Sequence, residues 1–313
     1  MATRAVNVAV VGTGVIGAGW ATHFLAHGFA VTATDPGQGA ESRLRNWIDD
    51  NWPVIERLGL ADGASRDKLT FTTDVGSAVR NADFIQESAP ERLDVKHAVI
   101  ASIESAARAD TIIASSSSGL TISDVQAGAQ HPERIVLGHP FNPSHIMPLV
   151  EVGGGRLTSP ENIAKTMAFY SSTGKKVIRI TKEVKGHIAN RLQVAIWQEA
   201  ISLVQRGAVS VEDVDAAISY GPGLRWALLG PFLNLHASGG PGGITHVLQH
   251  LGAAQREWAR DLGMYPETDD YIESIASGVE AELHSYDFSE MLRQRDQLLI
   301  QLLKAKRSLS QIP

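Results

Sequence analysis

The chain has 313 residues, which is enough for two domains of ordinary size, and its 43% apolar and 20% charged residues are typical of a soluble globular protein. A net charge of -6 with no dense run of Lys or Arg excludes a nucleic-acid surface, and no stretch is long and apolar enough to cross a membrane. The absence of cysteine excludes disulfides, thiolate catalysis and cysteine-ligated metals. It does not assign a compartment but is compatible with the cytoplasm, where we expect the protein, and we expect no metal site.

Short apolar runs of the kind that form β-strands alternate with helical patterns over the first part of the chain. Such alternation is typical of βα units that build a parallel sheet. Runs that are apolar throughout are expected where helices cover both faces of the sheet. We therefore predict a Rossmann-type, doubly wound α/β domain over residues 1–182. The predicted strands are Val6–Val11, Ala30–Thr34, Asp83–Gln86, Thr111–Ala114, Ile135–Gly138, Leu149–Val152 and Val177–Ile180.

The strand-like runs then stop, and apolar residues recur every four positions, which predicts a long helix. Ser210 with Asp213 is typical of the start of the next helix. Residues 250–309 continue the helical pattern, so we predict an all-α C-terminal domain over residues 183–313. The apolar positions of the long helix are Ile188, Leu192, Ile196, Ala200 and Val204.

The first predicted strand leads into Gly12-Thr-Gly-Val-Ile-Gly17, and a helical pattern follows. In such a turn Gly12 permits the tight bend, Gly14 lets a pyrophosphate approach the backbone, and Gly17 lets the helix pack on the sheet. Asp35, 18 residues beyond Gly17, can accept hydrogen bonds from both ribose hydroxyls and would repel a 2′-phosphate. The pattern predicts NAD rather than NADP. The alternative is a glycine-rich turn in an unrelated α/β protein.

Polar and ionisable residues gather in three segments, 115–120, 139–143 and 148–152, near the ends of predicted strands. In a doubly wound sheet the carboxyl ends of the strands face the ligand crevice. A dehydrogenase needs a base that takes the hydroxyl proton as hydride leaves carbon, and His139 suits this near neutral pH. Glu151 is the natural partner to orient the imidazole and stabilise its cation. Taken alone, Glu151 could be a surface residue of a strand.

The sequence resembles the L-3-hydroxyacyl-CoA dehydrogenase superfamily over essentially its whole length. The resemblance implies His139 as the base and Glu151 as its partner. It also implies that Ser118 and Asn190 lie at the substrate oxygen, where a hydroxyl and an amide can donate to a developing oxyanion. Either residue could instead cap a helix. The matching segments are GTGVIG at 12–17, ESAPERLDVK at 87–96, SSSSGL at 115–120, HPFNP at 139–143, PLVEV at 148–152, KEVKGHIANRL at 182–192 and GPGLRWALLGPF at 221–232.

The same resemblance places Glu91 and Lys96 on the cofactor side of the site, and it implies a homodimer formed mainly through the helical domain. The other partner that we expect is a small-molecule substrate. The expected contacts of NAD are Gly12, Gly14, Val15, Ile16, Gly17, Asp35, Glu91, Lys96 and Asn142.

Two segments indicate a branch of the family. Acyl-CoA enzymes carry Asn and Thr where this chain has Ser116 and Ser117, and their loop before the Gly-Pro differs from the one at 221–232. The stretches ESAPERLD at 87–94 and Gly-Leu-Arg-Trp at 223–226 resemble the L-carnitine dehydrogenase branch most, with the L-gulonate 3-dehydrogenase and lambda-crystallin branch close to it. The resemblance implies NAD-dependent oxidation of the 3-hydroxyl of L-carnitine to 3-dehydrocarnitine.

L-Carnitine carries a carboxylate and a trimethylammonium group, and the chain has a partner for each. Arg225 could clamp the carboxylate. Trp226, Phe232, Tyr220 or Trp197 could face the quaternary ammonium, which cannot form hydrogen bonds and favours aromatic faces. Trp226 could instead anchor packing or a dimer interface, and Arg225 could form a salt bridge within the helical domain.

Other functions remain open. The substrate could be L-gulonate or an L-3-hydroxyacyl-CoA. The protein could also be a crystallin-like structural protein or a nucleotide-sensing module on the same fold. The presence of His139, Glu151 and Asp35 argues against both non-enzymatic alternatives.

Overall fold

The computed structural model describes residues 6–312 and divides into two compact units, Met1–Asn190 and Arg191–Pro313. The sequence pattern predicts the division after residue 182, at the end of the last predicted strand. No helix within residues 6–312 is long and apolar enough to cross a membrane.

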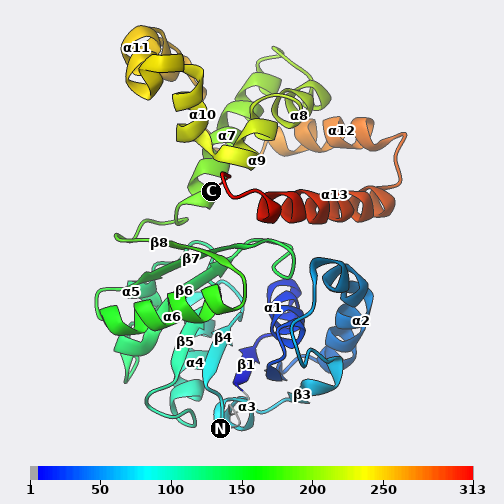
Figure 1. The fold of residues 1–313 in the computed structure, drawn as a ribbon, viewed down its shortest axis with the longest axis vertical. Helices are drawn as coiled ribbons and strands as arrows, with labels where there is room; N and C mark the ends of the chain where they lie inside the picture. Colours follow the sequence, from blue (N-terminus) through cyan, green and yellow to red (C-terminus); the bar gives the residue numbers. More distant parts are fainter. Residues whose placement is uncertain (1–5, 313) are drawn as a thin grey trace. The chain divides into compact units, whose positions relative to one another are not determined.

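The first unit is built on an eight-stranded sheet with the order β3-β2-β1-β4-β5-β6-β7-β8 (Figure 1). Neighbouring strands are parallel except for β6 and β7, which run antiparallel. The strand order reverses between β1 and β4, which is where a doubly wound sheet binds its ligand. The strands are β1 (Asn7–Val11), β2 (Ala30–Thr34), β3 (Leu69–Thr72), β4 (Phe84–Glu87), β5 (Ile112–Ser115), β6 (Ile135–Pro140), β7 (Leu149–Gly154) and β8 (Lys176–Arg179).

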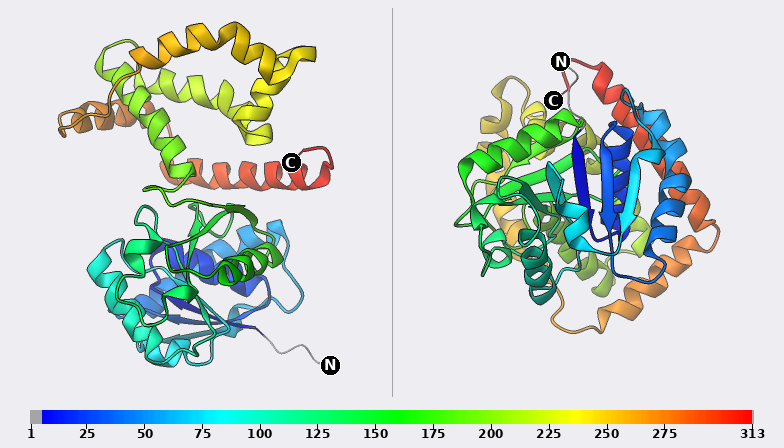
Figure 2. Two further views of the ribbon diagram at one scale, coloured as in Figure 1. Left: turned by 90° about the vertical axis from the view of Figure 1, so that its left-hand side faces the viewer. Right: turned by 90° about the horizontal axis from the view of Figure 1, so that it is seen from below.

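Helices cover both faces of this sheet, as Figures 1 and 2 show. Two apolar cores result, one shared with α1, α2 and α6 and the other with α3, α4 and α5. The helices are α1 (Val15–Ala26), α2 (Ala40–Leu58), α3 (Val75–Val79), α4 (Leu93–Glu104), α5 (Ile122–Val125) and α6 (Pro160–Ser172), with 3₁₀ turns at Arg66–Lys68 and Pro132–Arg134.

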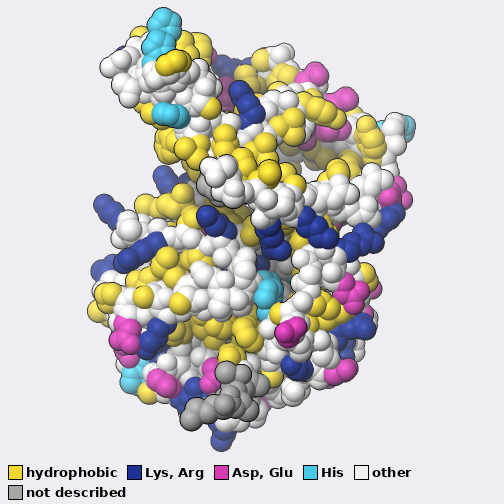
Figure 3. All heavy atoms as spheres, viewed as in Figure 1, with side chains coloured by type: hydrophobic (Ala, Val, Ile, Leu, Met, Phe, Trp, Pro, Cys, Tyr) yellow, Lys and Arg dark blue, Asp and Glu magenta, His cyan; other side chains and the backbone are white. Residues whose placement is uncertain are grey.

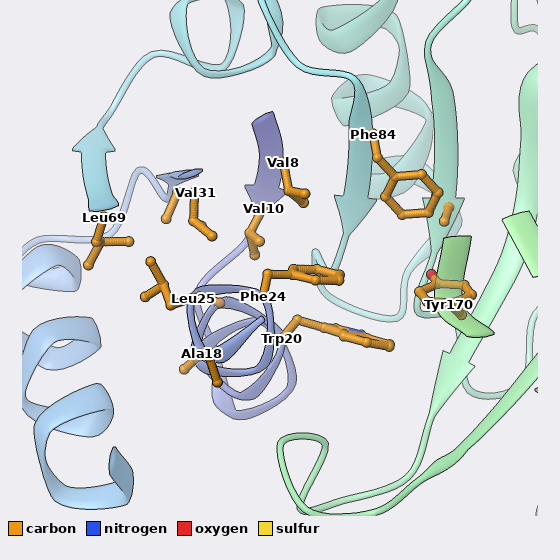
Figure 4. Packing of buried hydrophobic residues seen from close by; sticks show 14 of the residues in the cluster. Val8, Val10, Ala18, Trp20, Phe24, Leu25, Val31, Leu69, Phe84 and Tyr170 are labelled. Atoms are coloured by element: carbon orange, nitrogen blue, oxygen red, sulfur yellow. The ribbon is translucent and has the colours of Figure 1, made fainter. Parts of the chain in front are cut away.

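The central strand β1 explains why the predicted strands are apolar throughout. Val8 and Val10 point into the first core and Ala9 and Val11 into the second, so neither face of the strand meets water. In the first core the ring of Trp20 stacks on Phe24 and on Tyr170 of α6, with ring centroids 5.1 and 5.2 Å from that of Trp20 (Figure 4). The prediction of a doubly wound α/β fold is confirmed.

The second unit is entirely helical, which confirms the predicted all-α domain. Ser210 caps α8 by accepting a hydrogen bond from the amide of Asp213, as the sequence predicts. The helices are α7 (Ala189–Gln205), α8 (Val211–Ser219), α9 (Pro222–Leu229), α10 (Pro231–Ser238), α11 (Gly243–Asp261), α12 (Tyr271–Leu283) and α13 (Phe288–Ser308), with a 3₁₀ turn at Gly240–Gly242.

Three features differ from the prediction. The edge strand β3 was not predicted, because within it only Leu69 is buried and the apolar signal is weak. The predicted parallel sheet is interrupted at β7, since the connection 141–148 is too short for a crossover between parallel strands. The predicted helical run 250–309 is wrong at 262–270 and at 284–287, the segments that separate α11, α12 and α13. In the first of these segments Gly263 approaches α7 so closely that an added Cβ would lie 1.9 Å from Ser202 Oγ.

Candidate active site

The turn after β1 has the backbone that the glycine motif predicts. Gly12 has a φ of +90°, and a Cβ there would lie 2.6 Å from the carbonyl oxygen of Ser88. A Cβ on Gly17 would lie 1.9 Å from the carbonyl oxygen of Gly12, so both glycines are required by the packing of the chain itself. Gly14 has no atom within 4 Å of such a Cβ, which leaves open space at the start of α1.

That open space fits a pyrophosphate. Helix α1 begins at Val15, and its N-cap Gly14 supplies no side chain to cap the first amides. The N–H groups at Val15 and Ile16 therefore lie at a positive helix end without a side-chain acceptor, which is the arrangement that binds phosphate groups.

Asp35 follows the end of β2, next to this turn. Its carboxylate accepts hydrogen bonds from the amide of Thr13 at 2.8 Å, from the Thr13 hydroxyl at 3.2 Å and from the amide of Gly37 at 2.8 Å. These bonds hold the carboxylate at the carboxyl end of β2, beside the phosphate turn, where an adenosine ribose would lie. The residues present thus fit a dinucleotide with free ribose hydroxyls.

The antiparallel pairing of β6 and β7 brings His139 and Glu151 together. The two residues are direct cross-strand partners, and His139 Nδ1 lies 2.8 Å from Glu151 Oε2. Both side chains are buried. The other carboxylate oxygen of Glu151 accepts hydrogen bonds from the amides of Ile188 at 3.1 Å and Ala189 at 2.9 Å, at the start of α7.

These contacts decide the charge of Glu151. Burial acts to raise the pKa of the carboxyl group, but the hydrogen bonds from His139 and from the amides of Ala189 and Ile188 outweigh it, so the pKa lies below its usual value. An anionic Glu151 accepts a hydrogen bond from Nδ1–H of His139. This bond fixes the tautomer in which Nε2 carries no hydrogen and can accept a proton. This is the geometry of a general base with its orienting carboxylate.

A loop of serines follows β5 and is held by Glu91. One oxygen of this carboxylate accepts hydrogen bonds from Ser117 Oγ at 2.7 Å and from the amides of Ser118 and Gly119 at 2.8 Å each. Burial acts to raise the pKa of Glu91, but the bonds from Ser117 and the loop amides lower it below its usual value. Asn190 donates from Nδ2 to the carbonyl oxygen of Ser118 at 2.9 Å, so the structure brings these two predicted residues together.

Lys96 is enclosed rather than presented to a ligand. Its ammonium nitrogen lies 3.0 Å from both carboxylate oxygens of Glu87 and 3.7 Å from Glu91 Oε2, and its side chain is 1% exposed. It supports the two carboxylates from within the unit, and its contact with the cofactor stays a prediction. Asn142, also assigned to the cofactor, is exposed in the connection between β6 and β7.

Two buried residues of this region were missed in the sequence. Glu87 ends β4 and accepts hydrogen bonds from Ser115 Oγ at 2.5 Å and from the amide of Ala89 at 2.7 Å. Its position in the sequence could have identified Glu87, because it is a carboxylate at the end of an apolar strand and the first residue of the segment 87–96. His187 lies against His139, and only its position just before the start of α7 pointed to it.

The predicted substrate residues all belong to the second unit. Trp197 lies on α7, Tyr220 ends α8, Arg225 and Trp226 lie on α9, and Phe232 lies on α10. All five are exposed within that unit. Among residues 6–312 Arg225 has no ion-pair partner, which removes the salt-bridge interpretation of this side chain.

The turn between α9 and α10 is fixed by Asn234. Its amide nitrogen donates to the carbonyl oxygen of Arg225 at 2.9 Å and to that of Gly230 at 2.7 Å. The backbone around the predicted carboxylate clamp is therefore ordered within its own unit. The role of these residues in substrate binding stays a prediction.

The first unit can therefore carry out the proton transfer of an alcohol oxidation. NAD, when bound, supplies the hydride acceptor. His139 is placed to take a hydroxyl proton at Nε2, and Glu151 is placed to stabilise the imidazolium that would form. The side chains of Ser118 and Asn190 are a hydroxyl and an amide that can donate to the substrate oxygen. No group of His, Asp and Glu within residues 6–312 could hold a metal ion.

Comparison with known proteins agrees with this arrangement. The family model "3-hydroxyacyl-CoA dehydrogenase, NAD binding domain" matches residues 7–184, and the model of the C-terminal domain of the same family matches residues 186–268. The chain is 48% identical to the L-carnitine dehydrogenase of Bacillus cereus over 95% of this chain and 91% of that protein. It is 44% identical to the L-carnitine dehydrogenase of Pseudomonas putida over 98% and 95% of the two chains.

Solved structures give the same result. An FHMPC 5-dehydrogenase, described as an NAD+-dependent dismutase, superposes with a TM-score of 0.85 at 28% identity, over 97% of this chain and 99% of that one. The 3-hydroxybutyryl-CoA dehydrogenase of Escherichia coli superposes with a TM-score of 0.62 at 27% identity, over 84% of this chain and 55% of that one. The predicted family, the enzyme class and the cofactor NAD are confirmed: the chain belongs to the 3-hydroxyacyl-CoA dehydrogenase family and is an NAD-dependent oxidoreductase that acts on a CH–OH group.

Proposed function

We propose that this enzyme oxidises the 3-hydroxyl of L-carnitine to 3-dehydrocarnitine. The observation that carries the proposal is the near-full-length identity of 44% to 48% with proteins named L-carnitine dehydrogenase. The paired His139 and Glu151 supply the acid/base chemistry that this oxidation needs.

The two ends of L-carnitine explain why the second unit would select it. The carboxylate needs a cation, and Arg225 has no competing ion pair among the described residues. The trimethylammonium group has a fixed charge and no hydrogen to donate, so it needs an aromatic wall. Trp226, next to Arg225 on α9, is the first candidate, with Trp197, Tyr220 and Phe232 as the other exposed aromatic side chains.

The test compares specificity constants for L-carnitine, L-gulonate, 3-hydroxybutyrate and 3-hydroxybutyryl-CoA. L-Carnitine should be the best substrate, and 3-hydroxybutyrate, which lacks the ammonium group, should be much poorer. If L-gulonate or the CoA ester exceeds L-carnitine tenfold or more, the carnitine assignment is wrong while the dehydrogenase class stands.

Variants of Trp226 test the aromatic wall directly. Trp226→Leu should lower kcat/KM for L-carnitine by roughly 5- to 30-fold, because one good aromatic face contributes about 1–2 kcal/mol in a desolvated site. Trp226→Phe is the matched control, since it keeps an aromatic face and should lose less. Neither change should affect 3-hydroxybutyrate to the same extent. An equal loss for both substrates would mean that Trp226 serves packing instead.

We also propose that the enzyme is a homodimer formed through the helical unit and that it works in the cytoplasm. Hydrophobic side chains are exposed over this unit (Figure 3), among them Tyr220 at 84%, Phe232 at 75% and Trp258 at 63%. Two apolar cavities of about 280 and 470 Å³ flank α7 and have Ala200 and Val214 in common. Such surface is typical of a subunit interface.

Sedimentation at micromolar concentration tests the dimer. The mass should be twice 33.6 kDa. A mass of one subunit would contradict the proposal. Substrate binding would then be the one proposed role left for the exposed aromatic side chains. Cell fractionation tests the location: activity should be found in the cytoplasmic fraction, and activity outside it would contradict the proposal.

A further inference from the structure

His187 has a strained backbone at the edge of the active site. Among residues 6–312 it is the one non-glycine residue with positive φ, at 50°, and its side chain is 4% exposed. Residues other than glycine adopt this left-handed conformation at a cost, and they keep it only where the surrounding structure imposes it. Such strain in a buried residue next to the catalytic pair points to a function.

The backbone at His187 serves Glu151. The left-handed residue is followed at once by Ile188 and Ala189, whose amides both donate to Glu151 Oε1, at 3.1 and 2.9 Å. The turn therefore supplies two of the hydrogen bonds that keep Glu151 anionic. A right-handed backbone at His187 would send the two amides in another direction.

The imidazole of His187 serves the serine loop. Its ring centroid lies 5.2 Å from that of His139, and its Nε2 lies 2.9 Å from the carbonyl oxygen of Ser117. A carbonyl oxygen only accepts, so Nε2 carries the proton and donates it. One side chain thus touches the ring of the base and fixes the residue before Ser118.

His187 is also held neutral. Burial lowers its pKa below the usual value, the bond to Ser117 and the carboxylates Glu151 and Glu91 act to raise it, and the neighbouring His139 lowers it further. A neutral ring places no positive charge beside the imidazolium that forms on His139 during turnover.

We propose that His187 is a positioning residue for the reaction. Its ring holds the Ser117–Ser118 loop at a fixed distance from His139, and its backbone directs the amides of Ile188 and Ala189 to Glu151. It touches neither substrate nor cofactor in this role. It acts through Ser118 on the substrate oxygen and through Glu151 on the base.

Two substitutions separate positioning from packing. His187→Gln keeps a neutral N–H donor that can reach the Ser117 carbonyl oxygen, whereas His187→Phe keeps the ring and loses the donor. Positioning predicts that Gln retains kcat within about threefold, while Phe lowers it about tenfold or more, as for the loss of a buried hydrogen bond. A packing role predicts the opposite order. NADH affinity, measured by fluorescence, should stay within about twofold in both variants.

Three further measurements complete the test. His187→Gly keeps the left-handed backbone without strain and removes the ring. It should also lower kcat about tenfold or more, and it replaces His187→Phe in the test if the Phe variant does not fold. His187→Phe combined with Ser118→Ala should cost less than the sum of the two changes, because His187 acts through the loop. His23→Phe is the matched control: this histidine is also 4% exposed, contacts Thr173, and should change stability without changing kcat.

The inference rests on the dehydrogenase reaction, and the assay uses whichever alcohol the wild-type enzyme oxidises. Failure of L-carnitine as a substrate would therefore overturn the proposed function alone. Phe equal to or better than Gln, strictly additive double variants, or a loss of kcat that follows NADH affinity would each overturn the positioning role of His187.

Discussion

Glu151→Gln should damage turnover more than removal of the whole side chain. The substitution keeps the shape of Glu151, but an amide has one acceptor oxygen and one NH₂ group. The amides of Ile188 and Ala189 both donate to one oxygen of the carboxylate, so the amide oxygen of Gln must face them. The NH₂ group then faces Nδ1 of His139, from which the carboxylate of Glu151 accepts a hydrogen bond in the wild-type enzyme.

This orientation inverts the tautomer of the base. Nδ1 of His139 must accept from the NH₂ group, so the ring proton moves to Nε2 and the atom that should take the substrate proton is occupied. Loss of a charge-assisted hydrogen bond alone costs about 1.5–3 kcal/mol, or roughly 10- to 150-fold. The wrong tautomer adds to this, and we expect a fall in kcat on the order of 10³- to 10⁴-fold, as for other carboxylate–histidine pairs.

Glu151→Ala is the control. Without a side chain to impose a tautomer, His139 can keep its proton on Nδ1, so Ala should retain more activity than Gln. The assay is initial-rate NADH absorbance, with NADH affinity measured separately. A Gln variant within tenfold of the wild-type enzyme, or an Ala variant clearly less active than Gln, would refute the assignment of the two backbone amides.

Three other changes test the remaining parts of the site. Asp35→Ala should lower the ratio of kcat/KM for NAD to kcat/KM for NADP. Equal values for both cofactors in the wild-type enzyme would contradict the role of this carboxylate. His139→Gln should leave NADH affinity nearly unchanged and lower turnover by at least about 100-fold, and near-normal turnover of this variant would remove His139 from the mechanism. Gly14→Ala should fold and weaken NADH binding. Gly12→Ala should lose thermal stability, since its Cβ would lie 2.6 Å from the carbonyl oxygen of Ser88. Equal melting temperatures of the two variants would contradict this difference.

Much of the first unit could be predicted because its signals are local. The glycine turn, Asp35 and the apolar strands are encoded within short segments, and each has one physical interpretation at that spacing. The pairing of His139 with Glu151 was predicted from chemistry, and the sequence does not contain its cause. It arises from the antiparallel return of β7, which the alternation of strands and helices gave no reason to expect.

The residues that were missed depend on contacts that are distant in the sequence. Glu87 accepts a hydrogen bond from Ser115 on the neighbouring strand and pairs with the buried Lys96, and no periodic pattern marks such a carboxylate. The ring of His187 contacts His139 of β6 and the carbonyl oxygen of Ser117, both distant in the sequence, so its backbone angle could not be inferred from its neighbours in the chain. The proposed substrate residues are exposed side chains of the second unit, and a sequence pattern cannot separate a subunit interface from a substrate-binding surface there.

Helix α7 begins at Ala189 in the first unit and continues to Gln205 in the second. Its first amide donates a hydrogen bond to Glu151, so the charge of this carboxylate depends on a helix most of which belongs to the second unit. For protein engineering, this means that the two units are not interchangeable modules. A chimera joined just after β8 would replace the amides on which Glu151 depends, whereas one joined within α7, beyond Asn190, would carry the complete proton-transfer apparatus to a new helical partner.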